Sequence, residues 1–297
     1  MSPIQSDKIA DDVGEKRPNF REEHCLENGD TVNAAELVTA ERLRSALWIT
    51  LNRPHAKNAL KFPETFVALE RLLQQVREDV SLKAVVISGA GETDFCIGSD
   101  ITFLEEAFRT RDFTLFRDYL YRINACFLAL EDLPVPTIAM VQGRARAGGF
   151  ELLLACDFVI LASEAVIGDV HTPFGHMPGA GATQRLARKV GIQKAMEIIL
   201  TGKWMSVEEA VQCGLALRSA PYSELRTATE DLVAQFENKT RDSLQFSKRA
   251  LLRGWDLPLR DGIQLEIQSY VEYLATSEEP AEIFRKNQAS RRERRGS

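Results

Sequence analysis

The sequence predicts an α/β fold with a largely parallel sheet, followed by a region made almost wholly of helices. Three observations support this. Short apolar runs of strand length recur between residues 47 and 162, segments with helical spacing lie between them, and the strand pattern gives way to helices after Gly202. Strands that alternate with helices form βαβ units, and such units favour parallel neighbours in one sheet.

The first half of the chain supplies the elements of the sheet. Apolar runs indicate buried strands at four places, 47–51, 84–88, 137–141 and 158–162. Apolar residues at helical spacing predict helices over two stretches, 65–79 and 113–130. The alternation of these elements predicts stacked βαβ units.

The second half carries helix boundary signals. Residues 206–214 (SVEEAVQCG) begin with a serine N-cap, have acids in the first turn and end with glycine. Residues 222–286 continue the helical pattern. The chain ends are polar, acidic at the start and basic at the end, which predicts flexible segments. We therefore expect a flexible N-terminal extension at 1–34, a core at 35–203, a helical region at 204–286 and a basic flexible tail at 287–297.

The stretch GRARAGGFELLLACD (143–157) holds the most informative functional signal. A glycine-rich turn runs into an apolar helical segment that carries one lone acid, Glu151. The first turn of a helix leaves N–H groups unpaired and carries partial positive charge, and Gly148 and Glu151 share a helix face. An oxyanion donor beside an acid-base group is what proton chemistry next to a carbonyl requires. The structural alternative is an ordinary turn followed by an acid that complements the helix dipole.

Composition narrows the classes of function. The 297 residues can bury a sizeable core, and the hydrophobic (44%) and charged (27%) fractions are ordinary for a globular protein. The net charge of −6 disfavours nucleic acid as a main partner, and no apolar run reaches the length of a membrane span. The first residues show no secretory signal, and the five cysteines contain no CxxC pair, which predicts a reducing, cytoplasmic compartment. None of the four histidines has metal-ligand spacing, so we expect no metal.

Four segments, in order and at matching spacing, resemble the crotonase superfamily, also called the enoyl-CoA hydratase/isomerase family. They are LNRPHAKNAL (51–60), FCIGSD (95–100), GRARAGGFELLLACD (143–157) and PGAGATQRL (178–186). The resemblance covers roughly residues 47–286. It implies a crotonase-like spiral of ββα repeats with a C-terminal α-helical region that packs against neighbouring subunits, in a homotrimer or hexamer. One fold can support many reactions, so the resemblance is stronger evidence for the fold than for the reaction.

The resemblance also implies roles for individual residues. The backbone amides of Ser99 and Gly148 match the pair that binds the thioester oxygen of the substrate, and Glu151 matches the first catalytic carboxylate. Burial in the apolar FELLLAC context should raise the pKa of Glu151, which suits an acid-base group near neutral pH.

Contacts to coenzyme A follow from the resemblance alone. The matching positions are Ala56, Lys57 and Ile97. Arg285 and Lys286 fall near a basic pair that reaches the nucleotide phosphate of a neighbouring subunit, although exposed cations at a helix end explain them equally well.

His171 departs from the family pattern. Hydratases of the family carry a second carboxylate at this position, whereas the segment here is GDVH (168–171). Histidine can still give or take a proton near pH 7, so Glu151 and His171 form a candidate catalytic pair. The alternative is that His171 is a polar loop residue and Glu151 works alone, as in single-acid isomerases.

Four further residues are candidates for the acyl pocket: Arg144, Arg146, Asp169 and His176. The two arginines are unusual in the glycine turn and favour a polar or anionic acyl group if they face it; otherwise they point to solvent. The other two flank the loop of His171 and could orient it or a substrate hydroxyl.

These observations predict an acyl-CoA enzyme that works through an oxyanion-stabilised enolate, nominally an enoyl-CoA hydratase/dehydratase of fatty acid metabolism with Glu151 as acid-base group. Isomerisation, thioester hydrolysis and C–C cleavage by Glu151 with His171 are alternatives. A non-catalytic crotonase-fold binding or scaffold protein is the second alternative. We expect no tightly bound cofactor, since coenzyme A is part of the substrate, and an acyl-carrier protein is the other possible carrier. No nucleic acid and no membrane is expected as a partner.

Overall fold

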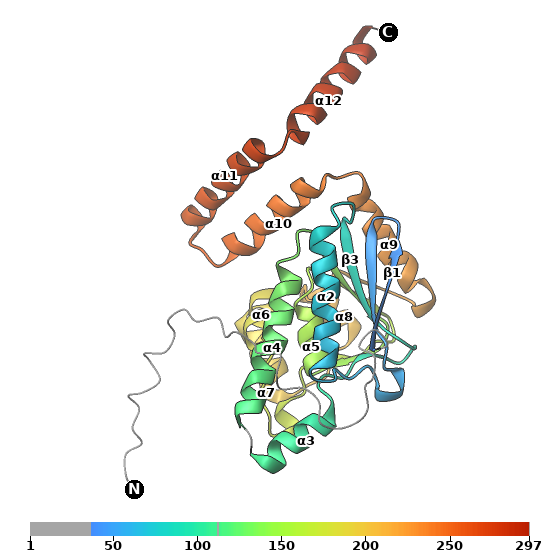
Figure 1. Ribbon diagram of the computed structural model, residues 1–297, viewed down its shortest axis with the longest axis vertical. Coiled ribbons are helices and arrows are strands. Elements are labelled where there is room, and N and C mark those ends of the chain that lie inside the picture. Colours follow the sequence, from blue (N-terminus) through green and yellow to red (C-terminus); the bar gives the residue numbers. More distant parts are fainter. Residues whose placement is uncertain (1–36, 112, 297) are drawn as a thin grey trace. The chain divides into compact units, whose positions relative to one another are not determined.

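The main sheet has six strands in a computed structural model that describes residues 37–111 and 113–296 (Figure 1). The predicted extension at 1–34 lies outside the described residues. In spatial order the strands are β1 (Val38–Leu43), β2 (Ala46–Leu51), β3 (Ala84–Gly89), β5 (Thr137–Val141), β7 (Phe158–Ala162) and β9 (Arg218–Ala220). Only the β1–β2 pair is antiparallel. The prediction of a largely parallel α/β sheet is therefore confirmed.

The four predicted strands correspond to β2, β3, β5 and β7, each within one residue at either end. The sequence pattern did not reveal β1, which forms a hairpin with β2 in a register that pairs Val38 with Leu51. Four of its six residues are exposed, as expected for an edge strand, so it has no apolar run that would mark it. The short β9 was missed as well, and it lies inside the region predicted to be helical.

A second, three-stranded parallel sheet was not predicted either. Its strands are β4 (Asp94–Cys96), β6 (Arg144–Arg146) and β8 (Ile167–Gly168), in that order. Strands of two or three residues are too short to show a period. Because the three strands are parallel, the chain leaves each of them at the same edge. The segments that follow them, 97–100, 147–151 and 169–171, are therefore brought together.

Helices cover the sheet and extend beyond it (Figure 1). They are η1 (Pro54–Ala56), α2 (Glu64–Glu78), α3 (Ile101–Thr110), α4 (Phe113–Glu131), α5 (Gly148–Leu154), η2 (Thr172–Phe174), α6 (Ala182–Val190), α7 (Ile192–Thr201), α8 (Val207–Gln212), α9 (Tyr222–Glu237), α10 (Arg241–Trp255), α11 (Leu259–Thr276) and α12 (Glu279–Gly296). The helices predicted at 65–79 and 113–130 are α2 and α4. Ser206 caps α8 as predicted, because its side chain accepts a hydrogen bond from the Glu209 amide.

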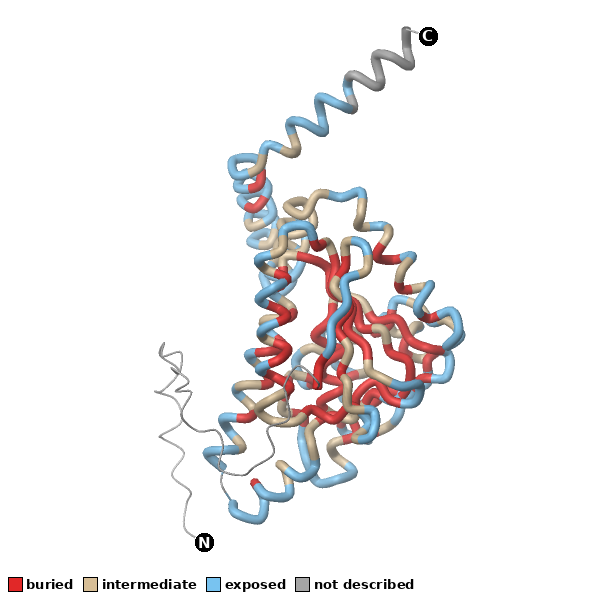
Figure 2. The backbone as a smooth tube through the Cα atoms, turned by 45° about the vertical axis from the view of Figure 1, so that its right-hand side comes forward, coloured by how far each residue is buried: buried red, intermediate tan, exposed pale blue. Residues whose placement is uncertain are grey.

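The core lies between the sheet and its covering helices (Figure 2). Side chains from α2, α4, α5 and β3 meet in one buried cluster that includes Leu69, Phe127, Leu152 and Ile87. Each such side chain stabilises the fold by about 1.5–3 kcal/mol when fully buried. Helix α9 packs on β5, β7 and β9. The helix α5, which carries Glu151, is buried along its whole length, so its position is fixed by packing.

Polar contacts tie α10 to the core. Lys248 donates to the Val135 carbonyl at 3.0 Å and pairs with Asp157 at 2.7 Å. Arg241 donates to the Val76 carbonyl at 2.7 Å, at the carboxyl end of α2. Helix α11 packs on α10, and most residues of both helices are exposed or half-buried (Figure 2).

Most of the basic segment predicted to be a flexible tail, 287–297, is helical, because α12 continues to Gly296. Its sequence is rich in Arg, Glu, Ala and Gln, which favour helix, and contains no proline. Among the described helices, none has both the length and the apolar character that crossing a bilayer requires.

Candidate active site

The segment after β4 and the start of α5 touch at the backbone. A Cβ added to Gly98 would lie 2.8 Å from the Gly148 nitrogen, and one added to Gly148 would lie 3.6 Å from the Ser99 nitrogen. Gly98 also has φ +95°, a conformation that side-chain-bearing residues rarely adopt. Glycine at Gly98 therefore allows the amides of Ser99 and Gly148, the predicted oxyanion pair, to lie close together.

Both amides are available to a ligand. Leu60 donates to the Gly98 carbonyl at 2.8 Å and accepts from the Asp100 amide at 3.0 Å. Successive backbone groups alternate in direction along an extended segment, so the Ser99 N–H points away from Leu60. Gly148 is the first residue of α5, where amides have no acceptor within the helix. Within the described part of the chain, neither amide donates a hydrogen bond.

The turn that presents Gly148 is strained. Ala147 has φ +48° and ψ −125°, an unusual conformation for alanine. Its amide donates to the carbonyls of Gly168 (3.3 Å) and Asp169 (3.1 Å) at the end of β8, which helps hold it in place. Strain of this kind costs on the order of 1–3 kcal/mol and concentrates at functional sites. The next glycine, Gly149, approaches β4 so closely that an added Cβ would lie 2.0 Å from the Cys96 oxygen.

Glu151 is 2% exposed, and one of its oxygens is held by two amides. Oε1 accepts from the N–H groups of Ala180 (2.7 Å) and Ala182 (3.2 Å), at the amino end of α6. Burial raises the pKa of Glu151, although the charge of His171 and the two amides oppose the rise. Oε2 accepts none of the hydrogen bonds in the described structure, so it is the oxygen left for proton transfer. The PGAGATQRL segment thus supplies the groups that hold the acid.

His171 is paired with a buried carboxylate. Its Nδ1 lies 3.0 Å from Oδ1 of Asp169, which is fully buried. Burial lowers the pKa of His171, but the hydrogen bond and charge of Asp169, together with the charge of Glu151, outweigh burial and raise it. Because Nδ1 faces Asp169, Nε2 is the nitrogen left to exchange a proton. Val170, between the two, has φ +47°, which is a rare conformation for a β-branched residue.

The other acyl-pocket candidates have different surroundings. Arg144 forms a two-point ion pair with Asp94, at 2.8 and 3.1 Å, which occupies its guanidinium group. His176 is exposed and stacks on Phe108 with ring centroids 5.1 Å apart. Arg146 is half-buried in β6, in register with Gly168 of β8. The structure thus brings Asp169 to His171 and gives Arg144 and His176 other partners.

The candidate coenzyme A contacts lie in two adjoining loops. Ala56 ends η1, and Lys57 follows it exposed, with φ +54°, while Ile97 is half-buried next to Gly98. Asn58 ties the first of these loops to the segment between β3 and β4, because its amide donates to the carbonyls of Ala90 (2.9 Å) and Asp94 (2.8 Å). Sequence reasoning missed Asn58, and a buried polar residue within a predicted binding loop was the signal available. Two exposed cations on α12 complete the candidates, Arg285 and Lys286.

Tyr119 on α4 is a second residue that sequence reasoning missed. Its hydroxyl forms a hydrogen bond with the hydroxyl of Ser99, and its ring lies against Phe62 and Phe103. Burial, with a further contribution from the charge of Glu151, raises the pKa of Tyr119, so the phenol stays protonated. In the sequence, Tyr119 is one residue of a predicted amphipathic helix, so the sequence gave no sign of its contact with Ser99.

Cysteine and metal chemistry find no support in the described residues. Cys96, Cys126, Cys156 and Cys213 are free thiols. Burial raises the pKa of each of the first three to about 12, which leaves them unreactive. Among the side chains that the structure describes, no three from His, Cys, Asp or Glu are grouped as metal ligands.

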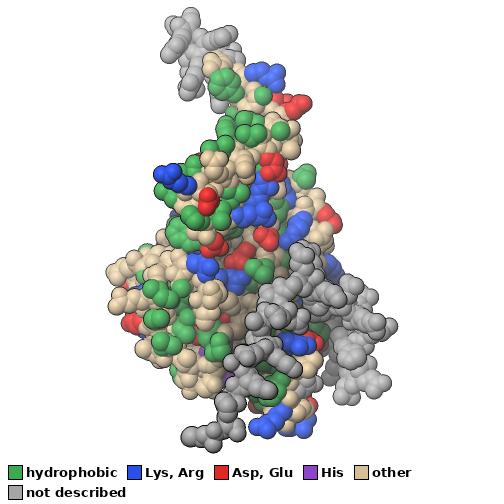
Figure 3. All heavy atoms as spheres, turned by 90° about the vertical axis from the view of Figure 1, so that its left-hand side faces the viewer, with side chains coloured by type: hydrophobic (Ala, Val, Ile, Leu, Met, Phe, Trp, Pro, Cys, Tyr) green, Lys and Arg blue, Asp and Glu red, His purple; other side chains and the backbone are tan. Residues whose placement is uncertain are grey.

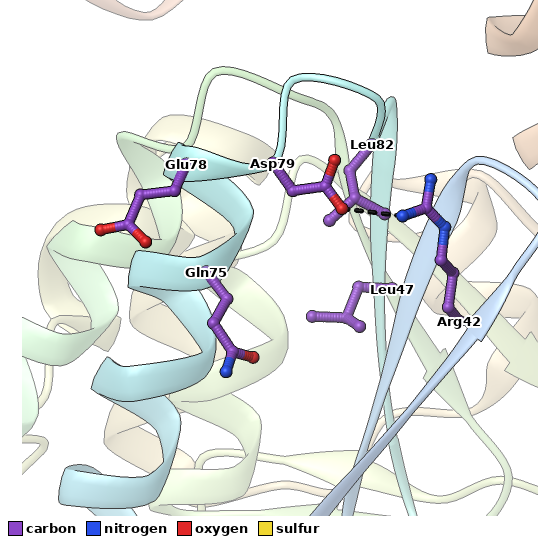
Figure 4. Close-up of a pocket in the computed structure, with 6 residues that line it drawn as sticks. All are labelled: Arg42, Leu47, Gln75, Glu78, Asp79 and Leu82. Atoms are coloured by element: carbon purple, nitrogen blue, oxygen red, sulfur yellow. Dashed lines mark hydrogen bonds and ion pairs between the residues drawn. The ribbon is translucent and has the colours of Figure 1, made fainter.

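A surface hollow of about 450 Å³ lies between α2 and the strands beside it (Figure 4). It is lined by Arg42, Leu47, Gln75, Glu78, Asp79 and Leu82. Leu47 is near the start of β2 and Leu82 precedes β3, whereas the candidate site lies in segments that follow strands. Ligands of parallel α/β sheets bind beyond the carboxyl ends of the strands, so this hollow is not part of the candidate site.

Comparisons with known proteins identify the family to which the chain is similar. The family model described as enoyl-CoA hydratase/isomerase matches residues 41–289. The putative enoyl-CoA hydratase/isomerase YngF of Bacillus subtilis is 33% identical, over 84% of this chain and 92% of that protein. A short-chain-enoyl-CoA hydratase of Clostridium acetobutylicum is 31% identical, over 78% and 87%. The crystal structure of an enoyl-CoA hydratase from Bacillus anthracis superposes with a TM-score of 0.79 at 30% identity, over 86% and 96%.

Proposed function

Because the chain belongs to the enoyl-CoA hydratase/isomerase family, we propose that it acts on acyl-CoA thioesters through an enolate held by the Ser99 and Gly148 amides. Family membership and the structural likeness confirm the resemblance seen in the sequence and the crotonase-like fold with its C-terminal helical region.

The proposal is supported by one observation. The start of α5 meets the segment after β4 on one side and the turn before α6 on the other, which brings the two unpaired amides together with the buried carboxylate of Glu151. Preorganised amides favour the oxygen as charge develops on it, and loss of one such donor costs on the order of 3 kcal/mol of transition-state stabilisation. Glu151 is three residues after Gly148 on the same short helix, so donor and acid-base group are fixed to each other.

The reaction we propose first is addition of water to an enoyl thioester, or its reverse. Glu151 takes a proton from water as the oxygen bonds to the β-carbon, and the electron pair of the double bond moves to the carbonyl oxygen between the amides. The enolate then collapses as the α-carbon takes the proton carried by Nε2 of His171. The proton that Glu151 took from water then passes to Nε2 of His171, which restores the starting state of both groups. The raised pKa of His171 supports its part as the acid.

The pairing of His171 with Asp169 also favours a second candidate. A histidine oriented by a carboxylate can activate water for attack on a carbonyl, which is the step that thioester hydrolysis and C–C cleavage of a β-keto acyl group require. If Glu151 acts alone, the same enolate leads to double-bond migration. These reactions differ in product, so one assay separates them.

Mass spectrometry after incubation with enoyl-, hydroxyacyl- and ketoacyl-CoA thioesters tests the proposal. We expect product from at least one thioester, and the Glu151→Gln variant should lose at least about a hundredfold in turnover. The exposed Glu208 supplies a control, since Glu208→Gln should keep the wild-type rate. Thioesters that bind without being consumed would instead indicate a scaffold protein. Near-normal turnover in Glu151→Gln would remove Glu151 from the mechanism.

We further propose that the α10 and α11 helices form a subunit interface in a homotrimer or hexamer. Their apolar side chains are widely exposed (Figure 3): Leu251, Trp255, Leu259, Ile267 and Val271 are 51–79% exposed. Apolar surface of this extent marks interaction sites. Light scattering on the full chain should give a multiple of 33.3 kDa, which Leu259→Glu should reduce; a monomeric wild-type chain would contradict this. We also propose that coenzyme A, and not a carrier protein, carries the acyl group. The proposed location of the protein is the cytoplasm.

A further inference from the structure

The turn that holds Glu151 is itself held by side chains that the proposed mechanism does not use. Two of its peptide groups carry the amides that bind Oε1, those of Ala180 and Ala182. Gly181 lies between them with φ +102°. This φ disfavours any residue with a side chain, and an added Cβ there would lie 1.9 Å from Nη1 of Arg185, so it would displace the guanidinium group.

Asn124, on α4, binds the same peptide group that binds Glu151. Its Nδ2 donates to the Gly179 carbonyl at 2.8 Å. That carbonyl and the Ala180 N–H belong to one planar peptide, so Asn124 fixes the direction in which the N–H points. Donation to the carbonyl also polarises the peptide and strengthens the bond that its N–H makes to Oε1.

Arg185, on α6, holds the next peptide group. Nη1 donates to the Ala180 carbonyl at 2.8 Å, while Nε and Nη2 each lie 2.7 Å from an oxygen of Glu131 at the end of α4. Arg185 is mostly buried, and a two-point pair of this kind keeps its guanidinium group in one orientation. Asn124 and Glu131 together connect the turn to α4.

We propose that Asn124 and Arg185 are positioning residues for Glu151. Asn124 orients the peptide group whose N–H binds Oε1, and Arg185 fixes the peptide group that lies between the two donors to Oε1, so that Oε1 is held and Oε2 is left for proton transfer. The inference that Glu151 takes part in catalysis rests on the proposed function, whereas the contacts that position its carboxyl group do not. Neither residue touches Oε1 or Oε2; each acts through the backbone of residues 179–181.

Infrared titration of the buried carboxyl group tests the inference without any turnover. The band of protonated Glu151 is identified by its absence in Glu151→Gln. Loss of the Asn124 amide weakens the bond to the ionised carboxylate, so in Asn124→Ala the midpoint should move to higher pH by about half a unit or more. Arg185→Lys, which keeps the charge beside Glu131 but lacks the planar fork, should move it in the same direction by less.

Arg122→Gln supplies the matched control. Arg122 lies on the same helix α4 and pairs with Glu70 on α2, at 2.6 and 2.5 Å, so the variant loses a comparable ion pair whose partner is on α2 and not in the turn. Its midpoint should equal that of the wild type. A purely structural role for Asn124 predicts lower thermal stability with an unmoved midpoint, and that result would overturn the inference.

Steady-state kinetics supply the second readout. In Asn124→Ala, kcat should fall about tenfold with KM little changed, and the acidic limb of its pH profile should follow the infrared midpoint. Provided that Glu151→Gln loses turnover, a wild-type kcat in Asn124→Ala overturns the inference. If Glu151→Gln keeps full turnover while the infrared midpoint still moves in Asn124→Ala, the proposed function fails and the positioning of Glu151 stands.

Discussion

The contact between Gly98 and Gly148 makes a sharp prediction, because an added methyl group can be placed in the structure. Alanine at position 98 puts Cβ 2.8 Å from the Gly148 nitrogen and 3.2 Å from Cβ of Ala147. Real Cβ atoms essentially never come within 3.0 Å of another heavy atom, so the two segments must separate by some tenths of an ångström. Gly98→Ala therefore disturbs the spacing of the two amides that we propose as the oxyanion site.

Backbone strain contributes separately, and a control isolates it. Gly98 has φ +95°, and an L residue there costs roughly 1–2 kcal/mol. Gly214 has φ +78°, and an added Cβ there has no neighbour within 4 Å. Both alanine variants should therefore lower Tm, by roughly 2–8 °C. Only Gly98→Ala should lose catalysis, by about a hundredfold, as the loss of one oxyanion donor does.

Two measurements decide the outcome: thermal unfolding of both variants, and their kcat/KM with the thioester that the wild type consumes. The expected result is a fall in Tm for both variants, at least as large in Gly98→Ala, and a loss of activity confined to Gly98→Ala. Activity in Gly98→Ala within about twofold of the wild type would refute the reasoning. An equal loss of activity in Gly214→Ala would show that strain, and not the spacing of the amides, is responsible.

Two further predictions concern charged residues of the site. In Asp169→Asn the pKa of His171 should fall, so the alkaline limb of the kcat profile should move to lower pH; an unchanged limb would contradict the pairing. Because the native pKa of His171 is raised, its protonation stabilises the fold fully below its unfolded-state pKa. That contribution is lost as pH rises through the native pKa. Denaturant titrations across this pH range should show that the free energy of unfolding depends on pH less in Asp169→Asn than in the wild type. In Arg144→Leu the buried Asp94 loses its ion-pair partner, so urea unfolding should show a free energy of unfolding lower by about 1–2 kcal/mol. Breaking a fully buried pair would cost more, but Arg144 is half exposed. An unchanged stability with a raised KM would place Arg144 in the acyl pocket instead.

Elements with a strong apolar period could be predicted from the sequence. The strands β2, β3, β5 and β7 and the helices α2 and α4 have interiors that alternate or repeat in hydrophobicity, and their predicted ends were close. The sequence did not predict the edge strand β1 or the short strands β4, β6 and β8. These segments are strands because they pair with other segments of the chain, and their own sequences show no strand pattern.

The candidate site shows the same division. The sequence placed Gly148 and Glu151 on one helix and marked a glycine turn within 178–186, but only the structure shows that this turn holds Glu151. It could not show what the polar side chains of distant elements bind. Asn124 and Tyr119 belong to an ordinary amphipathic helix in the sequence, and their contacts to Gly179 and Ser99 exist only once α4 is packed. Such contacts between distant residues leave no local pattern.

The central claim is that a thioester oxygen lies between the amides of Ser99 and Gly148, beside Glu151. A crystal structure of the Glu151→Gln variant with a bound enoyl-CoA tests it most directly. The account predicts the carbonyl oxygen about 2.7–3.1 Å from both nitrogen atoms, with the α- and β-carbons next to residue 151. A carbonyl oxygen beyond hydrogen-bond reach of either nitrogen would contradict it.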